Sequence, residues 1–480
     1  MTRFRSVLSL VGAAILFAPM AQADQRSDAA VAELHRARAT NDVKLHPLLR
    51  VLANGSRDSR SRENLQRRLP EFAGTSVTVN VVVEGDAKAA ASQMKSLGLS
   101  NPRTFGSMVS GRVPVTALKA LAALPGVHNI RPAMAHTNSG LVTSQGDRAQ
   151  RSDIARSRFN VDGRGVKVGI LSDSFGCLTG PIFPNQMFTT TADDIKNGDL
   201  PADVKVLAEQ SPCDGGHDEG RAIAQIIHDV APGASILYHS AFNGEADFAQ
   251  GIIDLADAGA NVIVDDVGYF DEPNFQDGIV AQAVDTVKKR GVAYFSSAGN
   301  DARASYEGSW RTSNSIGFSG VRHNFGTRKS PDGLQTITLT AGAIEAVFLN
   351  WDQPFASTGG KGSRSDVDLI YYDMDGNLIP LCDDNLQPAV CQFPGATDNI
   401  GGDAFEEGDI LNTSGVDVQV QLSVELFTGP TPGYLKYIYY DYGDGTMFVD
   451  EYDTQSGTLN GHPKARGAEG IGAAAWYVLD

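Results

Sequence analysis

The sequence has few cysteines, no surplus of basic residues and no long apolar run beyond its N-terminus. Its 480 residues include 40 Lys and Arg against 57 Asp and Glu, a formal net charge of −17. Nucleic acid is bound by clustered Lys and Arg, so we expect no nucleic-acid partner. No later run is long enough for a transmembrane helix, so we expect no membrane partner. The absence of CxxC and HxxxH spacings argues against a metal site.

The first residues have the layout of a secretory signal peptide. Arg3 and Arg5 precede an apolar run from Val7 to about Pro19, and small residues follow in Ala21-Gln22-Ala23. The apolar run is too short to span a bilayer. We therefore expect residues 1–23 to be removed and the protein to be secreted or periplasmic. The alternative is a buried N-terminal helix.

The four cysteines form an even set in a chain expected to be exported, so two disulfides are possible. Their order suggests local pairs, Cys177 with Cys213 and Cys382 with Cys391. Sequence alone does not fix this connectivity.

The pattern of apolar residues divides the rest of the chain into regions with different predicted secondary structure. Residues 24–75 are polar, whereas 76–140 predict a small α+β domain of ferredoxin-like type. After a linker at 141–160, continuous apolar strands alternate with helices over 161–305, which predicts a parallel α/β sheet with helices on both faces. Short strands with Gly, Asn and Asp turns predict an all-β sandwich over 306–458. Residues 459–480 again have the pattern of the α/β domain, so we expect the sandwich to be inserted into that domain.

Polar side chains stand at the ends of three predicted strands. Asp173 follows VGILS, Asp266 lies in NVIVDDVG, and Asn300 ends SSAGN. Ligands of parallel α/β sheets bind at the carboxyl ends of the strands, so these residues should line one edge. Each also has a simpler explanation, because Asp and Asn are common in turns and helix caps.

Glu219 opens the predicted helix EGRAIAQIIHDV. It shares a stripe with Ile223, Ile227 and Val230, which we expect to be buried, and His217 lies nearly opposite. A buried carboxylate should have a raised pKa, which suits a general base. Two alternatives stay open: Glu219 complements the helix dipole, or His217 is the base, two residues out of register.

Together these segments resemble serine peptidases of the subtilisin and sedolisin clan. Asp173 matches the catalytic Asp of that clan. EGRAIAQIIHDVAPGA resembles the segment HGTHVAGII with its following APGA turn, and Glu219 stands in the place of the catalytic His, as in sedolisins. Asn300 matches the oxyanion-hole Asn of subtilisins. Asp266 falls beside the nucleophile on a wall of the substrate cleft, either as a second acid or as a turn cap. The chain departs from sedolisins at Asn300, where they carry Asp, and at Ile223, where they carry a second acid.

The resemblance implies a division of roles: Glu219 accepts the proton of a serine, Asp173 orients Glu219, and Asn300 stabilises the oxyanion. It implies acidic working conditions, protein or peptide substrates and no cofactor. DVDLIYYD and GGDAFEE are acidic enough for structural calcium, but their spacing does not support it, and a solvated acidic face is the simpler expectation. Residues 76–140 resemble a subtilisin propeptide, which would make this domain a partner of the peptidase core.

The nucleophile is missing from the resemblance. The clan carries its serine in GTSxAxP, and no such stretch follows Asn300; Gly74-Thr75-Ser76 precedes Asp173, against the family order. GIGAAAWY resembles a strand upstream of the serine helix, so we expect a C-terminal truncation. The preferred function is a secreted serine endopeptidase. The alternatives are an inactive binding protein acting through its β-sandwich and an inhibitor or chaperone acting through residues 76–135.

Overall fold

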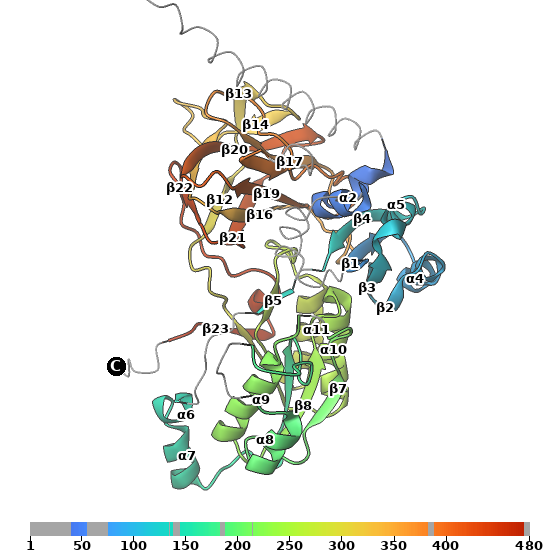
Figure 1. Ribbon diagram of the computed structural model, residues 1–480, viewed down its shortest axis with the longest axis vertical. Coiled ribbons are helices and arrows are strands. Elements are labelled where there is room, and N and C mark those ends of the chain that lie inside the picture. The colour runs from blue at the N-terminus through green and yellow to red at the C-terminus, as the bar shows by residue number, and fades with distance from the viewer. Residues whose placement is uncertain are drawn as a thin grey trace, which may run out of the picture.

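The computed structural model describes residues 40–54, 75–133, 135–137, 145–182, 188–213, 215–382 and 388–474. The protein has mixed α and β content, with one parallel sheet and several antiparallel sheets. Figure 1 shows the parallel sheet and its helices in the lower half, a β-sandwich above them, and a smaller α+β unit at the side. The predicted signal peptide lies outside the described residues.

The smaller unit, called the N-terminal module here, comprises residues 40–54 and 75–133. Its sheet has the order β2-β3-β1-β4, and all pairs are antiparallel. The strands are β1 (Ser76–Val83), β2 (Ser100–Phe105), β3 (Met108–Pro114) and β4 (Val127–Pro132), and the helices are α4 (Ala87–Ser96), α5 (Leu118–Ala122) and α2 (Pro47–Asn54), with 3-10 turns at Asn41–Lys44 and Val115–Ala117. Leu48, Leu49 and Leu52 of α2 are buried in the same cluster as Val79 and Val81 of β1. Part of the segment expected to be polar therefore belongs to this core.

The parallel sheet has the strand order β23-β11-β9-β6-β8-β7, which confirms the predicted parallel α/β sheet. Its strands are β6 (Lys167–Ser172), β7 (Lys205–Ala208), β8 (Ser235–Ser240), β9 (Val262–Asp265), β11 (Ala293–Ser297) and β23 (Ala468–Ile471). Its helices are α8 (Thr191–Asn197), α9 (Glu219–Val230), α10 (Glu245–Asp257) and α11 (Ile279–Lys289), and the short helices α6 (Gly146–Ala149) and α7 (Ser152–Phe159) precede β6.

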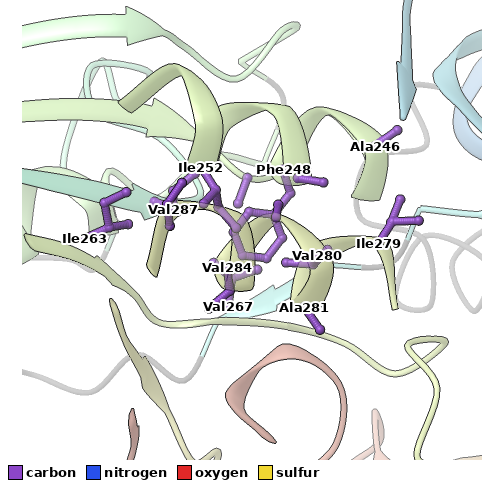
Figure 2. Close-up of a cluster of buried hydrophobic side chains, with 14 of the residues drawn as sticks. Ala246, Phe248, Ile252, Ile263, Val267, Ile279, Val280, Ala281, Val284 and Val287 are labelled. Carbon is purple, nitrogen blue, oxygen red and sulfur yellow. The ribbon is translucent and has the colours of Figure 1, made fainter. Parts of the chain in front are cut away.

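Successive strand residues face opposite sides of the sheet and enter different cores. Leu171 joins the cluster built with α10 and α11, whereas its neighbour Ile170 joins the one that includes Ala224 of α9. Figure 2 shows Phe248 of α10 against Val280 and Val284 of α11 in the first cluster. The sheet is therefore covered on both faces.

The β-sandwich consists of two antiparallel sheets, β12-β21-β16-β19-β18 and β13-β14-β20-β15-β22, with β17 paired to β20. Its strands are β12 (Ser305–Ser309), β13 (Thr312–Ile316), β14 (Val321–His323), β15 (Gln335–Leu339), β16 (Ile344–Trp351), β17 (Asp366–Tyr372), β18 (Val390–Phe393), β19 (Phe405–Asn412), β20 (Val418–Thr428), β21 (Tyr434–Asp441) and β22 (Met447–Val449). A 3-10 turn, η3 (His462–Lys464), follows, and β23 then pairs in parallel with β11.

The expectation of a solvated acidic face on the sandwich is wrong. Asp366, Asp368 and Glu406 are at most 4% exposed. Neighbouring polar groups reduce the cost of burying these carboxylates. The backbone N–H of Thr397 and the side chain of Asn399 donate to Glu406 Oε1, each over 2.9 Å. Burial, followed by the charge of Asp368, raises the pKa of Glu406 well above its usual value.

Both predicted disulfides are confirmed. Cys177 bonds to Cys213 and Cys382 to Cys391. Among the helices in the described part of the chain, none is long and apolar enough to cross a membrane.

Candidate active site

Asp173 lies directly after β6, at the carboxyl edge of the parallel sheet. Its carboxylate is buried and accepts hydrogen bonds from the backbone N–H groups of Ser174, His217 (2.5 Å) and Glu219 (2.9 Å). Burial raises the pKa of Asp173, and these three donors oppose that rise. Asp173 therefore fixes the backbone at the start of α9.

Glu219 is the first residue of α9 and is 9% exposed. The Ser172 hydroxyl donates to its Oε2 over 3.3 Å. The next residue, Gly220, allows the helix to approach the sheet closely, because a Cβ there would lie 2.3 Å from a ring carbon of Tyr238. The structure thus brings Asp173 and Glu219 together at the end of β6.

The predicted burial of the isoleucine stripe of α9 is wrong in part. Gly220, Arg221 and Ala224 are the buried positions beside Glu219, whereas Ile223 and Ile227 are only half-buried. The physical reason is that the small residues make the close contact with the sheet, and the larger side chains lie at the margin of that contact.

Arg221 is a buried contributor that the sequence did not single out, because it lies outside the stripe of large apolar residues. Its guanidinium pairs with Asp194 (2.5 Å) and Asp218 (3.1 Å). Asp218 Oδ1 in turn accepts the backbone N–H groups of Cys177 (2.7 Å) and Leu178 (3.1 Å). The Cys177–Cys213 disulfide connects the same two loops, so the segment after Asp173 is held from two sides.

The two alternative residues, His217 and Asp266, occupy different environments. The His217 side chain is exposed, and its backbone N–H is the part that contacts Asp173. Asp266 is half-buried between β9 and β10 (Val267–Tyr269). Asn300 is exposed in the turn after β11, next to Gly299, whose φ of +75° suits glycine. Because β9 lies between β6 and β11, all these residues share the carboxyl edge of the sheet.

A separate strand lies on β10 beside this edge. β5 (Ala135–Thr137), just after the N-terminal module, pairs with β10 in antiparallel register, with residue 136 opposite Gly268. Residues of β10 also line a pocket. The pocket is formed by three segments of the chain, Val267–Phe270, Ser297–Asp301 and Thr458–Pro463, and its apolar lining includes Val267, Phe270, Leu459 and Pro463.

No protein family and no curated protein matches the chain. Solved structures that match part of it include fervidolysin from Fervidobacterium pennivorans, described as a keratinolytic enzyme related to subtilisin (16% identity, TM-score 0.27, 47% of this chain and 40% of that one). A second is the epidermin leader peptide processing serine protease of Staphylococcus aureus (16%, 0.29, 48% and 61%), and a third is the prenylagaramide maturation protease PagA (18%, 0.22, 32% and 51%). The chain covers less than two thirds of each of these proteins.

Proposed function

We propose that the chain forms the peptide-binding and acid–base part of a secreted or periplasmic serine endopeptidase of the subtilisin and sedolisin clan. The observation that carries this proposal is β5. An extended segment lies antiparallel on β10, beside a pocket and on the edge where Asp173 and Glu219 lie. Strand addition of this kind recognises a peptide by its main chain, and a pocket adds selectivity for one side chain. The apolar lining favours an apolar side chain.

The N-terminal module supports the proposal as an internal partner of the core. Helix α10 begins after Gly244, which has no side chain to cap it. Two side chains of the module supply the cap instead: Asn80 Oδ1 accepts the backbone N–H of Glu245 (3.3 Å), and Ser110 Oγ accepts that of Ala246 (3.1 Å). A domain that caps a core helix and leads directly into the strand on β10 suits the role of a propeptide.

The proposed chemistry assigns a separate step to each side chain. A serine hydroxyl attacks the peptide carbonyl carbon while its proton passes to the Glu219 carboxylate, and the carbonyl oxygen becomes an oxyanion beside Asn300. Glu219 then returns the proton to the leaving amine as the C–N bond breaks, and water hydrolyses the acyl-enzyme. Asp173 positions Glu219 through the backbone. A carboxylate base predicts an acidic working range.

The nucleophile of this proposal lies outside the described residues. Within them, the serine hydroxyl bonded to Glu219 is that of Ser172, which is completely buried and closed to a substrate. The gene sequence beyond the codon for Asp480 tests this point directly. An in-frame GTSxAxP supports the endopeptidase; a stop codon together with no casein hydrolysis between pH 3 and pH 8 would favour a binding protein. In an active protein, Glu219→Gln should abolish hydrolysis while His217→Ala should not, and the reverse result would assign the base to His217.

The peptide-binding part is tested with the chain itself. We expect a variant in which prolines replace residues 135–137, called the opened variant, to bind a fluorescent peptide of residues 133–140, measured by anisotropy, because proline has no N–H to donate to β10. The unaltered chain, whose β10 is already paired, should bind the peptide far less. In an antiparallel ladder the N–H groups of alternate residues point toward and away from the partner strand. N-methylation at position 136 and at positions 135 and 137 together should therefore differ in effect. Equal binding by both methylated peptides, or no binding by the opened variant, would overturn strand addition.

A further inference from the structure

A buried group of four polar side chains lies outside the proposed catalytic residues and close in sequence to the segments that line the pocket. His462 of η3 stands at its centre. Its Nδ1 is 2.6 Å from Glu272 Oε1 and its Nε2 is 3.2 Å from Asp265 Oδ1. The Ser296 hydroxyl donates to Asp265 Oδ1 over 2.6 Å, and its oxygen lies 3.1 Å from His462 Nε2. The four side chains, which we call the His462 cluster, are at most 6% exposed.

The geometry defines the charge state of His462. Each ring nitrogen faces a carboxylate oxygen, and a carboxylate offers only acceptors, so both nitrogens carry a proton. Burial by itself lowers the pKa of His462, but the charges of Glu272 and Asp265 raise it to about 10. The other close neighbours are the ring of Phe248, from α10, and the phenol of Tyr294, from β11. Burial, followed by the charge of Asp265, raises the pKa of that phenol.

The arrangement Ser296–His462–Glu272 has the connectivity of a nucleophile, a base and an orienting acid, but two observations exclude that role. A ring that is already protonated cannot accept the serine proton. Ser296 is 2% exposed, so a substrate carbonyl has no route to its hydroxyl. The cluster therefore needs a different explanation.

The explanation lies in where the four residues sit along the chain. Asp265 and Glu272 bracket the pocket segment Val267–Phe270, Ser296 precedes the segment that begins at Ser297, and His462 lies within Thr458–Pro463. Each of the three pocket walls thus contains a member of the cluster or lies within two residues of one. We propose that the His462 cluster is a positioning device that holds these three walls in register. His462 supplies the charged link of the third wall, beside the neutral hydrogen bond from Asn460 Nδ2 to the Tyr269 oxygen (3.1 Å). A role of the cluster in substrate selection rests on the proposed function. The positioning of the three walls does not depend on that function.

Hydrogen exchange followed by mass spectrometry tests the positioning on the whole chain. In His462→Gln, we expect exchange of backbone amides in all three wall segments to accelerate by about tenfold or more. The variant loses the charged contacts with Asp265 and Glu272 and the contact with the Ser296 hydroxyl. His323→Gln is the matched control: His323 is also completely buried, but it lies in the sandwich and bonds to the Tyr306 hydroxyl. It should leave the three segments unchanged. Acceleration confined to residues 458–466 would mean a local packing defect and would overturn the proposal.

A spectroscopic measurement on the unaltered protein provides a second test that does not depend on a variant folding. With ¹³C-labelled histidine, the His462 ring should show imidazolium chemical shifts at pH 8, whereas His323, whose pKa is lowered by burial to about 3, should be neutral. A neutral His462 at pH 8 would overturn the charged link. This outcome is separate from that of the proposed function. If the opened variant fails to bind the peptide but His462→Gln accelerates exchange in all three walls, only peptide binding by strand addition is refuted. If the opened variant binds the peptide but exchange accelerates in one wall alone, only the positioning role is refuted.

Discussion

Of the residues that we identify in ion pairs between the N-terminal module and the rest of the protein, Arg131 is the one whose replacement we expect to destabilise the fold most. Its side chain, at the end of β4, is 4% exposed. Nη2 donates to Asp403 Oδ2 of the sandwich over 2.9 Å, Nε is 3.3 Å from Asp271 Oδ2 of the core, and the guanidinium carbon lies 4.9 Å from the ring centroid of Phe405. One residue therefore contacts both other parts of the protein.

We expect Arg131→Met to cost about 3–5 kcal/mol, because removing one partner leaves buried carboxylates without their counter-charge. Arg164→Met is the control, since Arg164 is 86% exposed and pairs with a partly exposed Asp162, a contact worth about 0–1 kcal/mol. Urea unfolding followed by circular dichroism at pH 7 measures both. The reasoning fails if Arg131→Met is no more destabilising than Arg164→Met.

The pH dependence gives a further check on Arg131. Burial raises the pKa of Asp271, and the charge of Arg131 opposes that rise, so the pKa climbs higher in the variant. A carboxyl whose folded pKa exceeds its unfolded value favours folding when protonated and opposes it when ionised. The stability deficit of Arg131→Met should therefore be larger at pH 8 than at pH 5. An equal deficit at both values would refute the electrostatic explanation.

Three further predictions concern separate parts of the structure. Gly220→Ala should lower the melting temperature, because its Cβ would meet Tyr238 at 2.3 Å and push α9 from the sheet; an unchanged melting temperature would contradict that contact. Leu49→Ala should cost about 2–5 kcal/mol in urea unfolding, since Leu49 is completely buried in the core of the module; a loss below about 1 kcal/mol would place it outside that core. Because its pKa is raised from 6.5 to about 10, His462 stabilises the fold fully below pH 6.5 and loses this contribution as the pH rises through 10. Thermal unfolding between pH 7 and pH 11 should show that decline in the unaltered protein and a shallower one in His462→Gln.

The parallel sheet was predictable from the sequence because its central strands are buried on both faces, so their sequences are continuous apolar runs. The disulfides were predictable because each joins neighbours in cysteine order. The environment of α9 was predictable only in part: a stripe of large apolar residues indicates a buried face, but the closest contact is made by Gly220 and Ala224. Arg221 is buried through its ion pairs with Asp194 and Asp218, and periodicity carries no information about such partners.

The His462 cluster was out of reach of sequence reasoning because its members are distant in the chain. Asp265 and Ser296 lie in the segments NVIVDDVG and SSAGN, but Glu272 and His462 lie outside every segment that the sequence singled out. His462 and Asp265 are separated by 197 residues, most of them in the β-sandwich. The sandwich leaves the sheet after β11 and returns at Thr458, whose hydroxyl donates to the backbone oxygen of Ala302 over 3.2 Å.

The return point of the sandwich is also the third wall of the pocket. A wall that directly follows a large insert in the chain moves with that insert unless contacts fix the wall to the sheet. Hydrogen bonds of the backbone fix β23 to β11 only from residue 468 onward. A charged side chain at position 462, held between Asp265 at the end of β9 and Glu272 in the turn after β10, contacts the core before that point. If the cluster positions the walls as we propose, the buried ions keep the shape of the pocket independent of motion of the sandwich. We infer this role as the reason for a buried charged group where an apolar side chain would fill the same space.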